Sequence, residues 1–120
     1  MNQVLDAKSE QRLAYFATLP QDWYDIGIGQ VITSTIIQAA RNLLIHFFQL
    51  FPVPYLFPST EGSISVEWHH LTDYPLTIDV HDDHYDCSAY IQGDVVSFEF
   101  GLDQIEEARE WCLQFHNRKP

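Results

Sequence analysis

Histidine and carboxylate side chains give this chain its clearest capacity for chemistry. Three histidines share one stretch with several acids: His69, His81 and His84 with Glu67, Asp79 and Asp86. Two histidines and a carboxylate are a donor set that binds transition metals. His81 and His84 flank a predicted turn, however, so their rings need not point to one place, and the sequence has no His-Glu-x-x-His or Cys-x-x-Cys motif. We therefore expect solvated histidines, no metal and no other cofactor.

Nucleophilic and phosphate-binding motifs are weaker still. Cys112 and His116 are four residues apart, which places them side by side on a helix. Cys112 also belongs to an apolar stripe with Trp111 and Phe115, so we expect a buried structural thiol instead of a nucleophile, and the same for Cys87. The Gly-x-Gly at residues 27–29 has neither a third glycine nor a preceding strand, and we interpret it as part of a loop held by Trp23. The sequence predicts no catalytic residue.

Acidic side chains dominate the charge of the chain. The formal net charge is −11, and twelve Asp and Glu lie between Arg41 and Arg109 without a single Lys or Arg among them. Such a field disfavours direct contact with nucleic acid or an anionic membrane. It favours a basic protein as partner, although an acidic composition that only aids solubility remains the alternative.

Two helical patterns fill the first half of the sequence. Residues 9–18 form a short apolar pattern that ends before Pro20. Residues 33–51 form a longer helix, capped by Thr33 or Ser34, whose apolar arc is interrupted only by a narrow polar stripe. That stripe argues against a membrane span. Such a wide arc predicts burial on more than one side, either as a central helix or through a homodimer formed by residues 34–51.

Alternating strands fill the second half. Residues 53–62 form a proline-rich extended segment that ends in a Glu61-Gly62 turn, and strands are expected at 63–70, 75–82, 85–91 and 95–100. Turns at Asp82-Asp83 and Gly93-Asp94 join them into an antiparallel meander. By parity Val96, Phe98 and Phe100 face inward. Four acids face outward: Glu67, Asp79, Asp86 and Glu99.

An amphipathic helix over residues 102–116 closes the chain and is expected to pack on the apolar face of the sheet. The predicted fold class is α+β, with two N-terminal helices, a four-stranded antiparallel meander and a C-terminal helix in one domain, 1–120. The N-terminus has no basic start followed by an apolar run, which predicts a cytoplasmic protein.

Two strings of residues resemble a family of small bacterial proteins with no assigned function. LPQDWYDIGIG at 19–29 is similar to its Leu-Pro-x-Gly-Trp-x-Asp-Gly-x-Gly string, and VPYLFPSTEGSISVEW at 53–68 to its Pro-x-x-x-Pro-Thr-x-Gly-Gly-x-x-x-Glu-Trp string. Asp22 and Ile26 stand where the family has glycines, and Ser63 replaces the second glycine of the turn. The resemblance implies a bacterial or phage origin and helices followed by a meander, and it assigns no catalytic residue.

Our leading functional hypothesis is an acidic, non-enzymatic binding protein that blocks or regulates a basic, possibly nucleic-acid-binding, protein partner. Antitoxins, immunity proteins and phage-encoded inhibitors of host defence work in this way. The predicted contact residues are Glu67, Asp79, Asp82, Asp83, Asp86 and Glu99. Two alternatives are a small metal-dependent or histidine-assisted enzyme that uses the outer sheet face, and an obligate homodimeric structural subunit.

Overall fold

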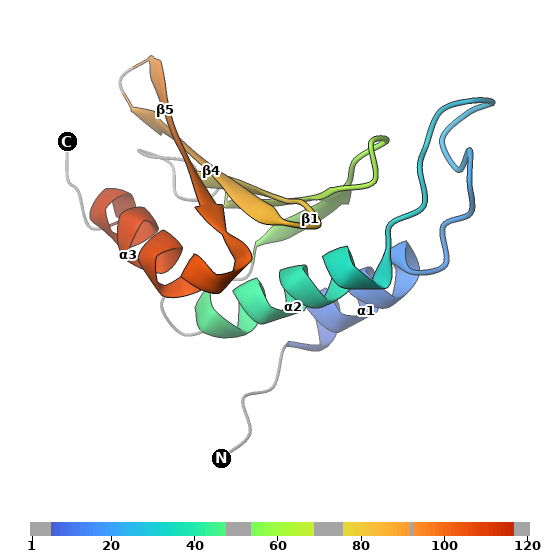
Figure 1. Ribbon diagram of the computed structural model, residues 1–120, viewed down its shortest axis with the longest axis horizontal. Coiled ribbons are helices and arrows are strands. Elements are labelled where there is room, and N and C mark those ends of the chain that lie inside the picture. Colours follow the sequence, from blue (N-terminus) through green and yellow to red (C-terminus); the bar gives the residue numbers. More distant parts are fainter. Residues whose placement is uncertain (1–5, 48–53, 69–75, 92, 117–120) are drawn as a thin grey trace.

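The computed structural model describes residues 6–47, 54–68, 76–91 and 93–116, in which a layer of helices lies under a five-stranded antiparallel sheet (Figure 1). The strand order β1-β2-β3-β4-β5 follows the chain, so each strand pairs with the strand before it. The α+β class is confirmed. The elements are α1 (Ala7–Phe16), α2 (Ser34–Phe47), β1 (Tyr55–Pro58), β2 (Ile64–Trp68), β3 (Leu76–Val80), β4 (His84–Ile91), β5 (Asp94–Gly101), a 3-10 turn (Leu102–Gln104) and α3 (Ile105–His116).

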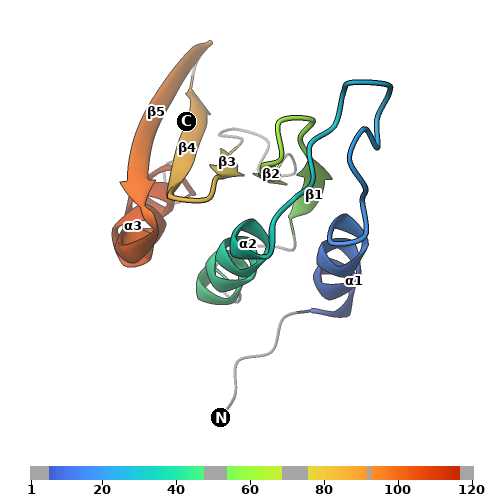
Figure 2. The same ribbon diagram turned by 45° about the vertical axis from the view of Figure 1, so that its right-hand side comes forward.

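All three helices cover the same face of the sheet. Helix α1 contacts β1, α2 contacts β2 and β3, and α3 contacts β4 and β5, an arrangement that Figure 2 shows from the side. Strict alternation in β2 and β3 turns one apolar set toward the helices, where Val66 and Ile78 are completely buried. The expected packing of the C-terminal helix on the sheet is confirmed. The opposite face of the sheet is left for the polar set.

Helix α2 is buried on several sides, as its sequence predicts. It contacts the sheet above and both α1 and α3 at its sides. Ala40 and Leu43 are fully buried. Across Ser34–Phe47 most of the apolar arc is thus covered within one chain, as expected for a central helix, while residues 48–51 lie outside the described ranges. Among the helices that the structure describes, none is long and apolar enough to cross a membrane.

The prediction of four strands was wrong, because residues 55–58 add a fifth. β1 pairs with β2 from Tyr55 opposite Glu67 to Pro58 opposite Ile64, and Leu56 points into the core. The proline-rich composition of this segment disfavours a strand in general. An edge strand tolerates proline, because the missing N–H can lie on the side without a neighbour.

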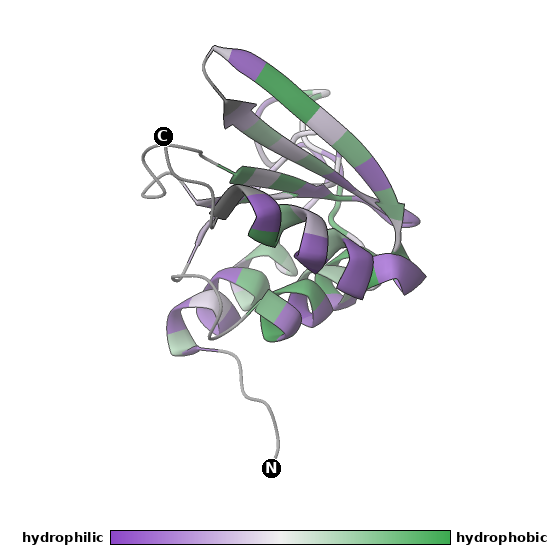
Figure 3. Cartoon of the chain, turned by 90° about the vertical axis from the view of Figure 1, so that its left-hand side faces the viewer, coloured by the Kyte–Doolittle hydropathy of each residue, from purple (hydrophilic) through white to green (hydrophobic). Residues whose placement is uncertain are grey.

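The hairpin of β4 and β5 also differs from the sequence prediction. Val96 and Phe98 have the inward parity, opposite Ala89 and Cys87, yet 41% and 56% of their surface is exposed. Only Phe100, at the base of the hairpin, is buried. Figure 3 shows β5 running past α3, with apolar and polar residues alternating along it. Parity therefore gave the correct face, but no helix in the described part of the chain covers Val96 and Phe98 completely.

Candidate functional site

Three of the predicted contact residues, Asp79, Asp86 and Glu99, lie in one row across the outer face of the sheet. We call these three residues the acidic row. The strand register aligns Phe57 of β1, Ser65 of β2, Asp79 of β3, Asp86 of β4 and Glu99 of β5. Adjacent strands are only about 4.8 Å apart, so the three carboxylates are immediate neighbours. Like charges directly opposite one another destabilise a sheet. The fold therefore tolerates an unfavourable arrangement here.

Glu67 lies on β2, two residues after Ser65 and on the same face of the sheet. A hydrogen bond connects it to Ser65, which lies opposite Asp79. The Ser65 hydroxyl donates a hydrogen bond of 2.9 Å to Glu67 Oε2. Partial burial raises the pKa of Asp79 above its ordinary value, and the charges of Asp86 and Glu67 raise it further, against a hydrogen bond from Ser65 and the charge of His81. The surroundings of Asp79 thus favour its protonated, neutral form.

Basic side chains of the described residues are confined to the helix layer. Lys8 and Arg12 belong to α1, Arg41 to α2 and Arg109 to α3. Arg41 binds Glu10 of α1 with both nitrogens, at 3.0 and 3.1 Å, and the Arg12 guanidinium donates to the Leu56 carbonyl oxygen at 2.8 Å. In the strands that the structure describes, no Lys or Arg offsets the acids of the outer face. The two layers therefore differ strongly in charge.

The β3–β4 turn brings His81 and His84 together, contrary to the expectation that they need not converge. Their rings stack with centroids 4.4 Å apart and planes inclined by 14°. Asp86 Oδ2 lies 3.3 Å from His81 Nε2 and 3.5 Å from His84 Nε2. Glu99 Oε1 lies 3.6 Å from the same His84 nitrogen. His69, the third candidate histidine, falls outside the described residues.

Asp82 and Asp83 form the exposed turn, as predicted, and Asp83 takes a specific role there. Its Oδ1 forms a short hydrogen bond with His84 Nδ1. This hydrogen bond raises the pKa of His84, the charges of Asp86 and Glu99 raise it further, and burial opposes them. The same bond with His84 lowers the pKa of Asp83. Both nitrogens of His84 thus face carboxylate oxygens.

The loop between α1 and α2 contributes surface residues that the sequence did not single out. Tyr24 and Ile26 expose 68% and 93% of their surface near its tip. Trp23 Nε1 donates to the Gln30 carbonyl oxygen at 3.0 Å, so the expected role of Trp23 in holding the loop is confirmed. The loop and the tip of the β4–β5 hairpin both rise on the side of the sheet that faces away from the helices (Figures 1 and 2).

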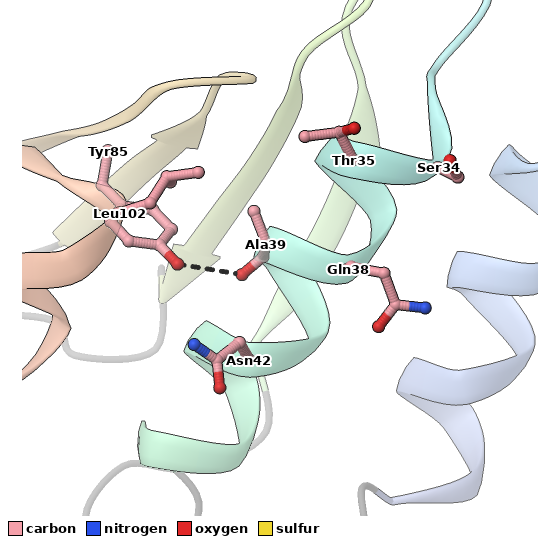
Figure 4. Close-up of a pocket in the computed structure, with 7 residues that line it drawn as sticks. All are labelled: Ser34, Thr35, Gln38, Ala39, Asn42, Tyr85 and Leu102. Atoms are coloured by element: carbon pink, nitrogen blue, oxygen red, sulfur yellow. Dashed lines mark hydrogen bonds between the residues drawn. The ribbon is translucent and has the colours of Figure 1, made fainter.

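A concave surface lies between α2, β4 and the 3-10 turn, and Figure 4 shows its lining. Its volume is about 580 Å³, and Tyr85 is the titratable group among its lining residues. Tyr85 donates a hydrogen bond of 3.1 Å to the Ala39 carbonyl oxygen, and burial raises its pKa to about 12. A phenol held in this way is a poor acid or base at neutral pH. The lining offers polar contacts without catalytic chemistry.

The cysteines are free and buried, as predicted. A hydrogen bond with Cys87, together with burial, raises the pKa of the Cys112 thiol well above its ordinary value. Since the thiolate is the nucleophile, Cys112 is unreactive at neutral pH.

Comparisons with models of protein families, with curated proteins and with solved structures found no match to this chain. The resemblance carried by residues 19–29 and 53–68 therefore stays a prediction.

Proposed function

We propose that the protein is a non-enzymatic binding protein whose outer sheet face docks a basic surface of another protein. The observation that carries this proposal is the acidic row, with the described Lys and Arg side chains all placed in the opposite layer. An excess of charges of one sign creates a field that extends beyond the surface and accelerates encounter with an oppositely charged partner.

Exposed apolar side chains offer further contacts to a partner. Ile26 and Tyr24 project from the α1–α2 loop, and Tyr90 and Val95 face outward near the tip of the β4–β5 hairpin, 50% and 64% exposed. Aromatic and aliphatic anchors beside a charged region are typical of protein interfaces. In this proposal the acids provide steering and orientation, and the exposed apolar side chains provide burial.

The class of partner follows from the charge. A protein that binds nucleic acid presents clustered Lys and Arg, and an acidic protein that covers this cluster blocks it. An antitoxin, an immunity protein or a phage-encoded inhibitor would act in this way. A cytoplasmic location and a bacterial or phage origin belong to the same proposal. The homodimer through residues 34–51 stays a separate prediction.

The test requires the purified partner and a charge change on each layer. The protein is used at low salt to isolate a basic partner from its native host, and association rates are then measured across a range of salt concentrations. Glu67→Lys/Asp79→Lys changes the outer face. Glu106→Lys/Glu110→Lys makes the same change in charge on α3, in the helix layer.

We expect the outer-face variant to associate more slowly and with a flatter salt dependence than the wild type, because steering depends on the charge removed. The α3 variant should retain most of both. Circular dichroism and thermal unfolding check that each variant is folded. An outer-face variant with unchanged affinity and an unchanged salt slope would place the interface elsewhere and refute the proposal.

A further inference from the structure

We propose that His81, His84 and Asp86 bind one zinc-type divalent transition metal ion at the β3–β4 turn. These three residues each offer one ligand atom, and the three atoms all lie within 4.8 Å of one another. The inference goes beyond the proposed function and does not depend on it, because a metal can bind here whether or not the outer face docks a protein.

Two of the three separations between the ligand atoms match a tetrahedral ion. Ligands held about 2.1 Å from zinc in a tetrahedron lie roughly 3.4 Å from one another. Asp86 Oδ2 lies 3.3 Å from His81 Nε2 and 3.5 Å from His84 Nε2. The Asp86 carboxylate therefore already sits at the correct spacing from both imidazoles. Glu99 Oε1 lies 3.6 Å from His84 Nε2 and adds a negative charge beside the three ligands.

Asp83 supplies the support that a metal-binding histidine requires. In most such sites the ligating histidine donates its other N–H to a carboxylate, which fixes the tautomer and the orientation of the ring. Asp83 Oδ1 holds His84 Nδ1 in this way. With the proton on Nδ1, the lone pair of His84 is on Nε2, the nitrogen that faces Asp86. The turn thus orients His84 for coordination.

The carboxylates around His84 favour a positive charge at its Nε2. Its Nε2 faces carboxylate oxygens of Asp86 and Glu99, and these oxygens accept hydrogen bonds but cannot donate them when ionised. Asp79, opposite Asp86 on β3, adds a further negative charge. Either a proton on Nε2 or a metal ion satisfies this arrangement.

Coordination requires only a small adjustment of the rings. The stacked imidazoles are nearly parallel, whereas an ion shared by both lies close to each ring plane. Rotation about the χ2 angles opens the stack, and His χ2 is a soft torsion. The His81 and His84 side chains are 30% and 25% exposed, which leaves room for this rotation. His84 also lies opposite Gly101, which has no side chain to obstruct it.

The ligand types select the metal. Imidazole suits zinc, nickel, copper and cobalt, whereas magnesium prefers an octahedral set of oxygens. We expect calorimetric titration of the full chain with Zn²⁺ to give one site that weakens at least tenfold in His84→Ala and in Asp86→Asn. Mg²⁺ should not compete for it. His46→Ala changes a histidine on α2, remote from the turn, and should bind Zn²⁺ like the wild type.

Two further measurements separate this site from adventitious binding. Asp83→Asn keeps all three ligands and should weaken Zn²⁺ binding by about 10-fold to 100-fold, because it removes the support of His84. Nuclear magnetic resonance should show the imidazole signals of His81 and His84 shifting together on Zn²⁺ addition. Absence of Zn²⁺ binding by the folded wild type, or binding that His84→Ala retains in full, would overturn the proposal.

Discussion

Asp79 offers the sharpest test of the strain that the acidic row places on the fold. It lies directly opposite Asp86 on the neighbouring strand, and its pKa is raised by burial and by the charges of Asp86 and Glu67. A carboxyl with a raised pKa in the folded state binds its proton more tightly than in the unfolded chain. Stability is therefore lost as the pH rises through that pKa.

Asp79→Asn removes the charge and keeps the size and shape of the side chain. A like-charge cross-strand pair costs about 0.2 to 1 kcal/mol. We expect the variant to be more stable than the wild type at neutral pH by about this amount, a rise in melting temperature of roughly 1 to 5 °C for a chain of this size. The exposed Glu61 of the β1–β2 turn provides a matched control, Glu61→Gln, for which no gain is expected.

Urea unfolding at neutral pH and at about pH 3, in low and high salt, makes the test specific. Below the ordinary pKa of 3.8 the carboxyl is protonated in both states, so the gain should vanish there. High salt should reduce it at neutral pH. A gain that persists at low pH would show that the effect is not electrostatic, and no gain at neutral pH would refute the reasoning about the acidic row.

Two further predictions concern His84 and the α1–α2 loop. The pKa of His84 is raised in the folded state, so its stabilising contribution is complete below about pH 6.5 and is lost as the pH rises through the folded value. The difference in unfolding free energy between the wild type and His84→Gln should therefore shrink between about pH 6 and pH 9 in metal-free buffer, and a constant difference would contradict this. Gly29 has a φ of +112°, and an added Cβ would lie 2.9 Å from the Tyr24 backbone nitrogen, whereas Gly27 has a φ of +73° and open space around it. Gly29→Ala should cost about 1 to 3 kcal/mol and more than Gly27→Ala in urea unfolding, and equal costs would show that the loop relaxes freely.

The convergence of His81 and His84 could have been deduced from the sequence. His81 continues the outward parity of Asp79, and His84 precedes Asp86 by two residues, so all four share one face once the turn at Asp82-Asp83 is assumed. Residues that flank a two-residue turn are cross-strand neighbours. The Asp82-Asp83 turn therefore brings the two imidazole rings together, contrary to the expectation that it would let them diverge.

The position of Glu99 beside Asp86 could be known only from the folded structure. Its place beside Asp86 depends on the register of β5 against β4, which the hairpin fixes through the turn at Gly93. The exposure of Phe98 could also be known only from the folded structure. The alternation of apolar and polar residues assigns each side chain to a face of the sheet, but it does not say where a covering helix ends. The same is true of Ile26, which stands out only once the loop is placed in space.

Local patterns alone determined the α+β class, the alternation of β2 to β5 and the amphipathic character of the last helix, because side-chain periodicity is a property of neighbouring residues. The tertiary structure decided the fifth strand, the covering of α2 by its own chain, and the alignment of Asp79, Asp86 and Glu99 into one row. Each of these depends on which distant segments lie side by side. Pairing and packing are set by the burial of the whole core, so no window of the sequence contains them.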